Sequence, residues 1–275
     1  MPKIRRLEAV RSLTRAVGAA SLISLASIGL AHAKGCPRKG TLGTSRTLSV
    51  DAVDFPQVGL KSFPQTLPLR DHEVVLTFDD GPWPPTTPKV LAALAKECVL
   101  ATFFMIGKPA SEHPTMVRRV AAEGHSIGHH TWTHFDLQAM PQSNAFKEID
   151  DGIAAVEQAL HGVATTTPTT PFFRFPGFQT TPATLDLLRS RGIVVFGADF
   201  WGNDWDPIPP ARELWLLTWR LRVARKGIIL LHDSQPKTAA ILPAFLRYLR
   251  DNHYHVVHVV PTGQPLTLTG YPDQS

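Results

Sequence analysis

The 275-residue sequence is poor in the features that mark several common classes of protein. It has only two cysteines, too few for a structural zinc site built from four of them. No glycine-rich fingerprint follows any predicted strand, which argues against nucleotide binding. The uncharged apolar segment 16–30 is shorter than the about 20 residues that span a membrane. What remains is a chain with 43% hydrophobic residues, enough for one sizeable core.

Residues 1–33 have the order of a secretory signal peptide. A basic beginning is followed by the apolar segment 16–30 and by Ala31-His32-Ala33, which has the small-x-small form of a cleavage site. We therefore expect cleavage after Ala33 and export to the periplasm or the medium, with no membrane attachment afterwards. An uncleaved membrane anchor is the second interpretation of this segment.

Most of the positive charge belongs to this leader. Removing residues 1–33 takes away five Lys and Arg and one Glu, which leaves 23 basic and 22 acidic residues and a net charge of +1. A nucleic acid or an anionic membrane as partner therefore loses its electrostatic support. We expect a monomer. Cys36 and Cys98 could pair in an oxidising compartment, or Cys98 could be a small buried hydrophobe, and the sequence leaves both open.

Strand and helix patterns alternate along residues 71–260, which predicts one α/β domain with a mainly parallel sheet. Residues 34–70, rich in Pro, Gly, Ser and Thr, are expected to be an irregular lead-in, and residues 261–275 a tail. The predicted fold is a distorted (β/α) barrel of about seven parallel strands. These strands are Glu73–Phe78, Val99–Ile106, His125–His129, Phe172–Phe175, Ile193–Phe196, Ile228–Leu231 and His255–Val260. Helices are predicted from Thr87 to about Lys96, from Pro114 to about Glu123, from a Ser143 cap along an apolar face that reaches Leu160, from Pro182 through Arg189, in the Leu- and Trp-rich segment after Pro209 and Pro210, and from Pro236 to Arg250.

Polar side chains follow five of these strands, where parallel barrels place their functional residues. The apolar run that begins at Val74 ends in Asp79-Asp80-Gly81, and two adjacent acids there are costly unless a positive group lies beside them. The other features are His130 with His134, Arg174, Asp204-Trp205 and His232-Asp233.

His130 and His134 are four residues apart, so one helical turn would put both imidazoles on one face. Two imidazoles and one carboxylate match a catalytic zinc site that keeps a position for water. His129 is the weaker candidate ligand. A glycosidase built on the paired acids would leave the two histidines without a role.

Five short motifs, in order along residues 71–260, resemble those of the NodB-homology polysaccharide deacetylases, carbohydrate esterase family 4. They are Thr77-Phe78-Asp79-Asp80-Gly81, His130-Thr131-Trp132-Thr133-His134, Arg174-Phe175-Pro176, Asp204-Trp205 and Leu230-Leu231-His232. The first two motifs are highly specific, and the third and fourth are looser.

The resemblance implies roles for these residues. Asp80, His130 and His134 would bind a divalent metal, with Zn²⁺ expected and Co²⁺ or another ion as alternatives. Asp79 would be the general base, with Arg174 holding it ionised. His232 would be the general acid, with Asp204 orienting it and tuning its pKa. The substrate would contact Pro176 and Gly177, whose N–H would face the oxyanion, and a pocket for the acetyl methyl walled by Trp205 and Leu230.

Two positions depart from the family pattern. Gly177 stands where the family often has an aromatic residue, which puts sugar stacking there in doubt. Trp201 stands where the fourth motif often has an acid, and the sequence does not show whether Asp199 replaces it.

The resemblance implies hydrolysis of N-acetyl groups on N-acetylglucosamine units of chitooligosaccharide or peptidoglycan. Amide hydrolysis needs an activated water and a proton for the leaving amine, work suited to an aspartate and a histidine. A covalent acyl-enzyme is not expected. Two alternatives stay open, an O-acetyl esterase acting on xylan or another acetylated polymer and a carbohydrate-binding barrel without turnover.

Overall fold

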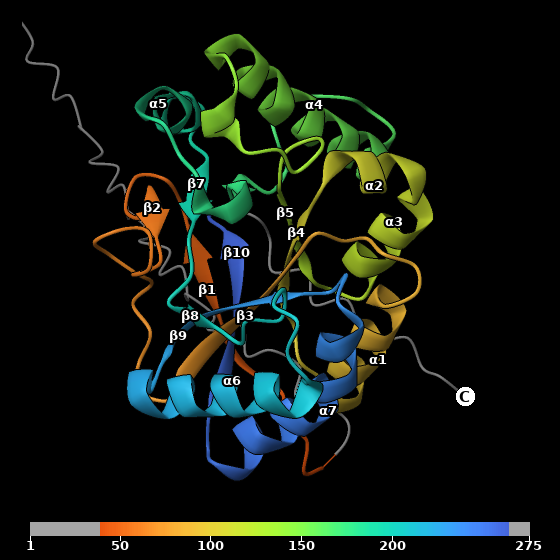
Figure 1. Ribbon diagram of the computed structural model, residues 1–275, viewed down its shortest axis with the longest axis vertical. Helices are drawn as coiled ribbons and strands as arrows, with labels where there is room; N and C mark the ends of the chain where they lie inside the picture. The colour runs from red at the N-terminus through yellow and green to blue at the C-terminus, as the bar shows by residue number, and fades with distance from the viewer. Residues whose placement is uncertain (1–38, 264–275) are drawn as a thin grey trace, which may run out of the picture. The chain divides into compact units, whose positions relative to one another are not determined.

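The computed structural model describes residues 39–263, whose strands form one parallel sheet with helices packed outside it (Figure 1). The strand order is β1-β10-β3-β4-β5-β6-β7-β2, and β9 pairs with both β3 and β8. The strands are β1 Thr44–Val50, β2 Gln57–Val58, β3 Glu73–Asp79, β4 Thr102–Met105, β5 Ser126–His129, β6 Phe172–Phe173, β7 Val194–Phe196, β8 Phe200–Trp201, β9 Gly227–His232 and β10 His255–Pro261.

Seven α-helices and two short 3-10 helices connect these strands in the described part of the chain. The long helices α4, α6 and α7 lie at the periphery in Figure 1. The helices are α1 Thr87–Glu97, α2 Gly107–Glu112, α3 Pro114–Ala122, η1 Leu137–Ala139, α4 Gln142–His161, η2 Pro176–Phe178, α5 Pro182–Ser190, α6 Pro210–Ala224 and α7 Pro236–Asp251.

Strand β3 is buried over its whole length and separates two apolar clusters. Val74, Leu76 and Phe78 pack with residues of the surrounding helices, whereas Val75 packs with side chains from other strands on the opposite face. Because side chains alternate along a strand, Asp79 has the parity of Val75. Its carboxylate therefore lies on the face that is lined by strands and not by helices.

The fold class is confirmed as α/β with a parallel sheet, but residues 39–263 form ten strands and not about seven. Residues 34–70, expected to be irregular, contribute β1 and β2 from their described part. β1 pairs with β10, and Arg46 in β1 binds Glu73 through two hydrogen bonds of 2.7 and 2.8 Å. A strand there covers an edge of β10 that would otherwise expose unpaired backbone groups.

Two helices also differ from the prediction. α2, between β4 and α3, was not predicted, and α4 begins after Pro141 and not at a Ser143 cap. The helix signal at α4 came from its apolar face, which is indeed buried at Ile149, Ile153 and Val156, while its first turn is exposed. Apolar spacing thus located the helix but not its first residue.

The predicted signal peptide, residues 1–33, lies outside the described residues and stays a prediction. Among residues 39–263 no helix combines the length and apolar character needed to span a membrane. Cys98 is disulfide-bonded, so the interpretation of Cys98 as a free buried thiol is wrong. Cys36, the other cysteine of the sequence, lies outside the described residues.

Candidate active site

The carboxyl ends of neighbouring strands bring the predicted polar residues together. In the register of the sheet, Asp79 at the end of β3 lies opposite His232 at the end of β9. β4, β5 and β6 continue the sheet, and His130 and Arg174 directly follow β5 and β6. The backbone N–H of Arg174 donates to the carbonyl of His129 at 3.0 Å, which fixes these two strand ends side by side.

Asp80, His130 and His134 form a cluster of possible metal ligands. One donor atom from each lies within 4.8 Å of the other two. The Nε2 atoms of His130 and His134 lie 3.6 and 3.4 Å from Asp80 Oδ1, a buried oxygen without a hydrogen-bond partner. A buried carboxylate oxygen without a donor is costly, and a cation between these three atoms would satisfy it. The donor set therefore fits one divalent cation.

The orientation of His130 is set by a contact behind it. Its Nδ1–H donates to the carbonyl of Arg174 at 2.6 Å, so the Nε2 lone pair is directed at the cluster. Burial lowers the pKa of His130, although the nearby carboxylates of Asp79 and Asp80 act in the opposite direction. The neutral form that a metal ligand requires is thereby favoured.

The HxxxH segment is a bent loop and not the helical turn that was expected. Thr131 and His134 have φ values of 62° and 64°, in the left-handed region, and the Thr131 hydroxyl accepts from the His134 N–H at 3.1 Å. The loop packs on α4, where a Cβ added at Gly152 would lie 2.3 Å from the Thr131 carbonyl carbon. This close approach to α4 curls the loop and brings the two imidazole centroids to 4.9 Å.

Arg174 is fully buried and holds Asp79 in place. Its Nη1 donates to Asp79 Oδ1 at 2.7 Å and to the Thr77 hydroxyl at 2.8 Å. Nε and Nη2 donate to the carbonyls of Phe196 and Gly197. Burial lowers the pKa of Arg174, whereas the adjacent negative carboxylate of Asp79 acts in the opposite direction and balances the buried positive charge. The second oxygen of Asp79, Oδ2, lies 3.7 Å from His130 Nε2 and faces the cluster.

Asp204 holds His232 in the same manner on the other side. Its Oδ1 lies 2.9 Å from His232 Nδ1, and its Oδ2 accepts the backbone N–H of His232 at 2.7 Å. Nε2 of His232 is thus directed away from Asp204, and it lies 4.0 Å from Asp80 Oδ2. Burial lowers the pKa of His232, but the charge and hydrogen bond of Asp204, with Asp80 and Asp79, outweigh it and raise this pKa to about 9. The imidazole can therefore carry a proton at neutral pH.

Known proteins resemble this chain in sequence and in structure. A family model described as polysaccharide deacetylase matches residues 67–196. The chitooligosaccharide deacetylase of Azorhizobium caulinodans is 34% identical over 174 residues, which cover 63% of this chain and 79% of that protein. The chain belongs to the polysaccharide deacetylase family. The predicted family is thus confirmed, and with it the assignment of the chain as a deacetylase, a hydrolase.

Two further comparisons place this deacetylase among its relatives. The chitooligosaccharide deacetylase of Rhizobium leguminosarum bv. trifolii is 46% identical over 94 residues, which cover 34% of this chain and 44% of that protein. The structure of the peptidoglycan deacetylase of Bdellovibrio bacteriovorus is similar with a TM-score of 0.71 and 29% identity. That match covers 82% of this chain and 61% of the other.

An aromatic row extends from His232 at this edge of the sheet. The ring of Trp205 lies 5.7 Å from that of His232, Trp201 lies 5.7 Å from Trp205, and Phe178 stacks on Trp201 at 5.7 Å. Trp205 is 45% exposed, as a residue that contacts substrate would be. Leu230 is buried and lies opposite Trp201 in the pairing of β8 with β9.

Pro176 and Gly177 lie in η2, which leads from Arg174 to the aromatic row. Pro176 is buried, whereas Gly177 is exposed with a φ of 54°, in the left-handed region. A Cβ added at Gly177 would meet only the Gln179 side chain, at 3.7 Å. The space above Gly177 is therefore open, and Phe178 takes part in the aromatic row instead.

The structure also settles the position of Asp199. Its carboxylate accepts the backbone N–H groups of Leu60 and Ile228 at 2.8 and 2.7 Å and the Thr66 hydroxyl at 2.8 Å. It therefore fastens the segment before β3 to the sheet, and its charge also acts on Arg174. The place that the fourth motif often gives to an acid is occupied by the Trp201 ring.

The segment Gly124-His125-Ser126-Ile127-Gly128 has the G-x-S-x-G form that a serine nucleophile would use. The position of Ser126 excludes that role. Ser126 begins β5, at the opposite end of the strand from His130, and is buried. Its hydroxyl donates to the Val259 carbonyl at 2.6 Å and lies 2.9 Å from His258. This serine ties two strands together.

Sequence reasoning missed two buried polar groups behind the site, Thr238 and Glu213. Thr238 on α7 lies within hydrogen-bond distance of Asp204 and of Glu213 on α6, and burial with the charge of Asp204 raises the pKa of Glu213 to about 7. Burial raises the pKa of Asp233, which accepts from Thr87, to about 7 as well. Asp233 directly follows the last motif and was singled out with His232, but nothing in the sequence pairs Thr238 and Glu213 with Asp204.

Proposed function

We propose that this deacetylase removes N-acetyl groups from N-acetylglucosamine units of an oligo- or polysaccharide, with zinc held by Asp80, His130 and His134. One observation carries the proposal. Asp79, fixed by Arg174, and His232, fixed by Asp204, approach the same three-ligand cluster at 3.7 and 4.0 Å from different strands. A base and an acid on two sides of one electrophilic centre are what amide hydrolysis needs.

The two imidazoles and the carboxylate fit a catalytic zinc ion. When bound, such a cation supplies a Lewis acid for the acetyl carbonyl oxygen and lowers the pKa of a water molecule towards about 7. The protein contributes the positions of the three ligands, and the carbonyl of Arg174 sets the orientation of His130.

Asp79 is the proposed base. Because Oδ1 is occupied by the Arg174 guanidinium, Oδ2 is the oxygen directed at the cluster. It takes a proton from the water that adds to the acetyl carbonyl carbon. Arg174 does not reach the substrate in this scheme. It positions Asp79 and balances its charge inside the sheet.

His232 is the proposed acid. Its Nε2–H donates a proton to the acetamide nitrogen as the carbon–nitrogen bond breaks, which releases acetate and leaves a free amine on the sugar. An amine is a poor leaving group without that proton, whereas an ester oxygen depends on it less. The high pKa that Asp204 confers on His232 therefore supports the N-acetyl over the O-acetyl reaction.

The aromatic row supplies the sugar-binding surface of this proposal. Trp205 and Leu230 would wall the pocket for the acetyl methyl, and Trp201 with Phe178 would extend the surface to further sugars. The backbone N–H of Gly177 is the proposed donor to the oxyanion, with Pro176 holding its loop. The relatives named chitooligosaccharide deacetylase and the similar structure named peptidoglycan deacetylase support these two glycans as substrates.

Export of a monomer is part of the proposal. The disulfide bond of Cys98 supports an oxidising compartment, as does the signal-like order of residues 1–33.

Replacing His232 with alanine is expected to lower turnover by about 10²–10⁴-fold with the metal retained, because it removes the proton donor and no ligand. Asp204→Asn is expected to lower turnover less, since it weakens the support of His232 and leaves the imidazole. Steady-state kinetics with metal content measured on the same samples checks this. A His232→Ala enzyme with wild-type turnover would contradict the assignment.

The proposed function is tested by incubating the mature enzyme and zinc with chitooligosaccharides, peptidoglycan glycan strands and acetylxylan. We expect acetate and new amines in equal amounts from an N-acetylated glycan. Release from acetylxylan alone would replace the proposal by the O-acetyl esterase. Release from none of them by metal-loaded protein would favour a carbohydrate-binding barrel without turnover.

A further inference from the structure

Helix α6 carries a second apolar surface, on the side away from its core contacts. Its buried side chains are Glu213, Leu217 and Leu221. Trp215 and Trp219, four residues apart, are each 45% exposed. An outward stripe of large aromatic side chains does not help α6 to pack, and such surfaces usually mark a binding site.

The two indoles are held in a fixed arrangement. Their rings are parallel to within 4°, with centroids 5.9 Å apart. The guanidinium of Arg212 lies 4.1 Å from the ring centroid of Trp215 and restrains it further. A rigid aromatic platform binds a flat ligand face without losing much side-chain freedom.

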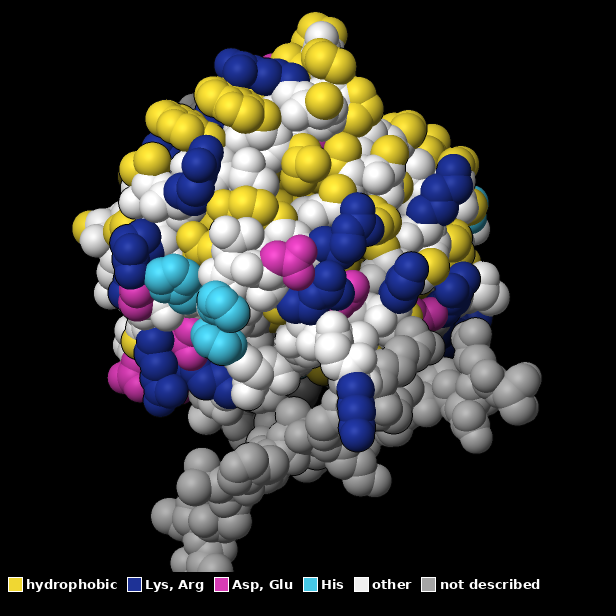
Figure 2. Space-filling model, turned by 90° about the horizontal axis from the view of Figure 1, so that it is seen from below, with side chains coloured by type: hydrophobic (Ala, Val, Ile, Leu, Met, Phe, Trp, Pro, Cys, Tyr) yellow, Lys and Arg dark blue, Asp and Glu magenta, His cyan; other side chains and the backbone are white. Residues whose placement is uncertain are grey.

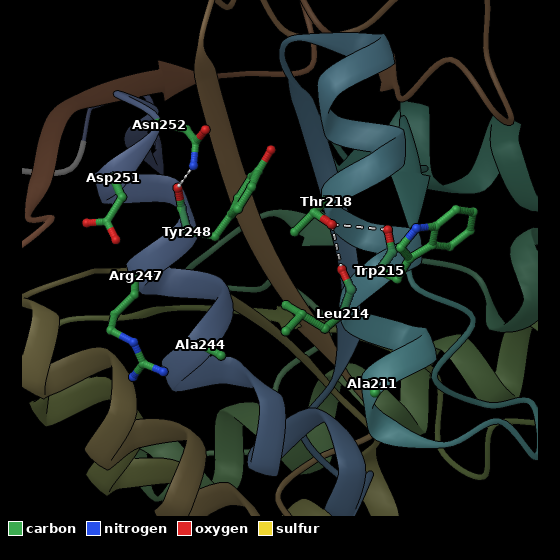
Figure 3. Close-up of a pocket in the computed structure, with 9 residues that line it drawn as sticks. All are labelled: Ala211, Leu214, Trp215, Thr218, Ala244, Arg247, Tyr248, Asp251 and Asn252. Carbon is green, nitrogen blue, oxygen red and sulfur yellow. Dashed lines mark hydrogen bonds between the residues drawn. The ribbon is translucent and has the colours of Figure 1, made fainter.

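Trp215 also borders a groove of about 500 Å³ between α6 and α7, and its indole extends from the side of α6 that faces away from α7 (Figure 3). This volume is within the range of sites that hold small molecules or short segments of a polymer. The apolar part of the lining is Leu214, Ala211 and Ala244. The polar part contains both donors and acceptors, namely Thr218, Arg247, Tyr248, Asp251 and Asn252.

None of these residues belongs to the catalytic site. Helices α6 and α7 lie on the lower side of the view in Figure 1, and Figure 2 shows that this side mixes apolar and basic side chains with some acidic ones. Arg247 and Asp251 in the groove have opposite charges. A carboxylate in the groove disfavours an anionic lipid surface, and the mixture of donors and acceptors disfavours a purely apolar partner.

We propose that the Trp215–Trp219 platform and the adjoining groove bind a glycan chain at a second, non-catalytic site. A pyranose ring presents an apolar face of C–H groups and a rim of hydroxyls. The indoles match the face of one sugar unit, and Asp251, Arg247 and the Asn252 amide oxygen match the hydroxyls of neighbouring units in the same chain. The inference rests on the proposed function in one respect, that the enzyme meets a polysaccharide long enough to contact a surface outside the active site.

The test measures binding without turnover. The Asp79→Asn enzyme is sedimented with insoluble chitin and with peptidoglycan sacculi, alone and combined with Trp215→Ala/Trp219→Ala. We expect the double alanine change to raise the dissociation constant for one of these polymers roughly tenfold or more. Trp215→Phe/Trp219→Phe is expected to retain most of the binding, and Val163→Ala, at another exposed apolar residue, all of it.

Two further measurements separate the possible outcomes. Ala244→Trp fills the groove and is expected to weaken binding with both indoles still present. In the otherwise wild-type enzyme, Trp215→Ala/Trp219→Ala is expected to leave kcat/KM on a short chitooligosaccharide unchanged.

Equal polymer binding with and without the indoles would overturn the proposal. Loss of binding only to phosphatidylglycerol vesicles would assign the surface to a membrane. An enzyme without activity whose polymer binding still needs the indoles would refute the proposed function and leave this site standing.

Discussion

Asp79→Asn is expected to lower turnover by about 10²–10⁴-fold while the bound metal stays at the wild-type level. Asparagine has nearly the same shape, and its carbonyl oxygen can still accept from the Arg174 guanidinium at the position of Oδ1. The atom at the position of Oδ2 can no longer take a proton. Because Asp79 is not one of the three proposed metal ligands, the bound cation should remain.

The matched control is the neighbouring residue. Asp80→Asn weakens a ligand, so it should lower both metal content and activity, and added zinc should restore part of the activity. Arg174 is buried, and loss of its ionised partner can destabilise the fold by about 3–5 kcal/mol. Thermal unfolding of Asp79→Asn therefore has to accompany the kinetics. A folded, metal-loaded Asp79→Asn enzyme with near wild-type turnover would refute the base assignment.

His134→Ala is expected to remove most of the bound metal and to lower activity by at least about 10²-fold, since the cation supplies several kcal/mol of transition-state stabilisation. Of the two histidines proposed as ligands, His134 is the better test. Its side chain is 38% exposed, whereas that of His130 is buried and bonded to the Arg174 carbonyl. Removing His134 therefore disturbs the site and spares the core.

Metal analysis of the dialysed protein measures this directly. The matched variant is His129→Ala, because the sequence made His129 the weaker candidate ligand. In the structure its Nε2 lies 3.7 Å from Glu157 Oε1 and does not face the cluster. His129→Ala should lower stability and keep the metal. Equal metal content in wild type and His134→Ala would remove His134 from the site.

The sequence alone located the elements and the polar residues at their ends. Apolar spacing is a local property, so β3, α1, α5 and α7 were predicted within a residue or two. Parallel strands end at one edge, so residues after different strands were expected to meet there. Asp79, Asp80, His130 and His232 do meet there.

Some contacts between elements have no local signal in the sequence, and only the tertiary structure decided them. β1 was hidden in a segment of weak periodicity, and it is a strand because β10 offers it an unpaired edge. The HxxxH loop is bent because the backbone of α4 approaches it closely at Gly152. Glu213 and Thr238 reach Asp204 only because α6 and α7 pack together. The exposure of Trp215 and Trp219 was equally hidden, since a Leu- and Trp-rich helix shows which side is buried only when it lies on its sheet.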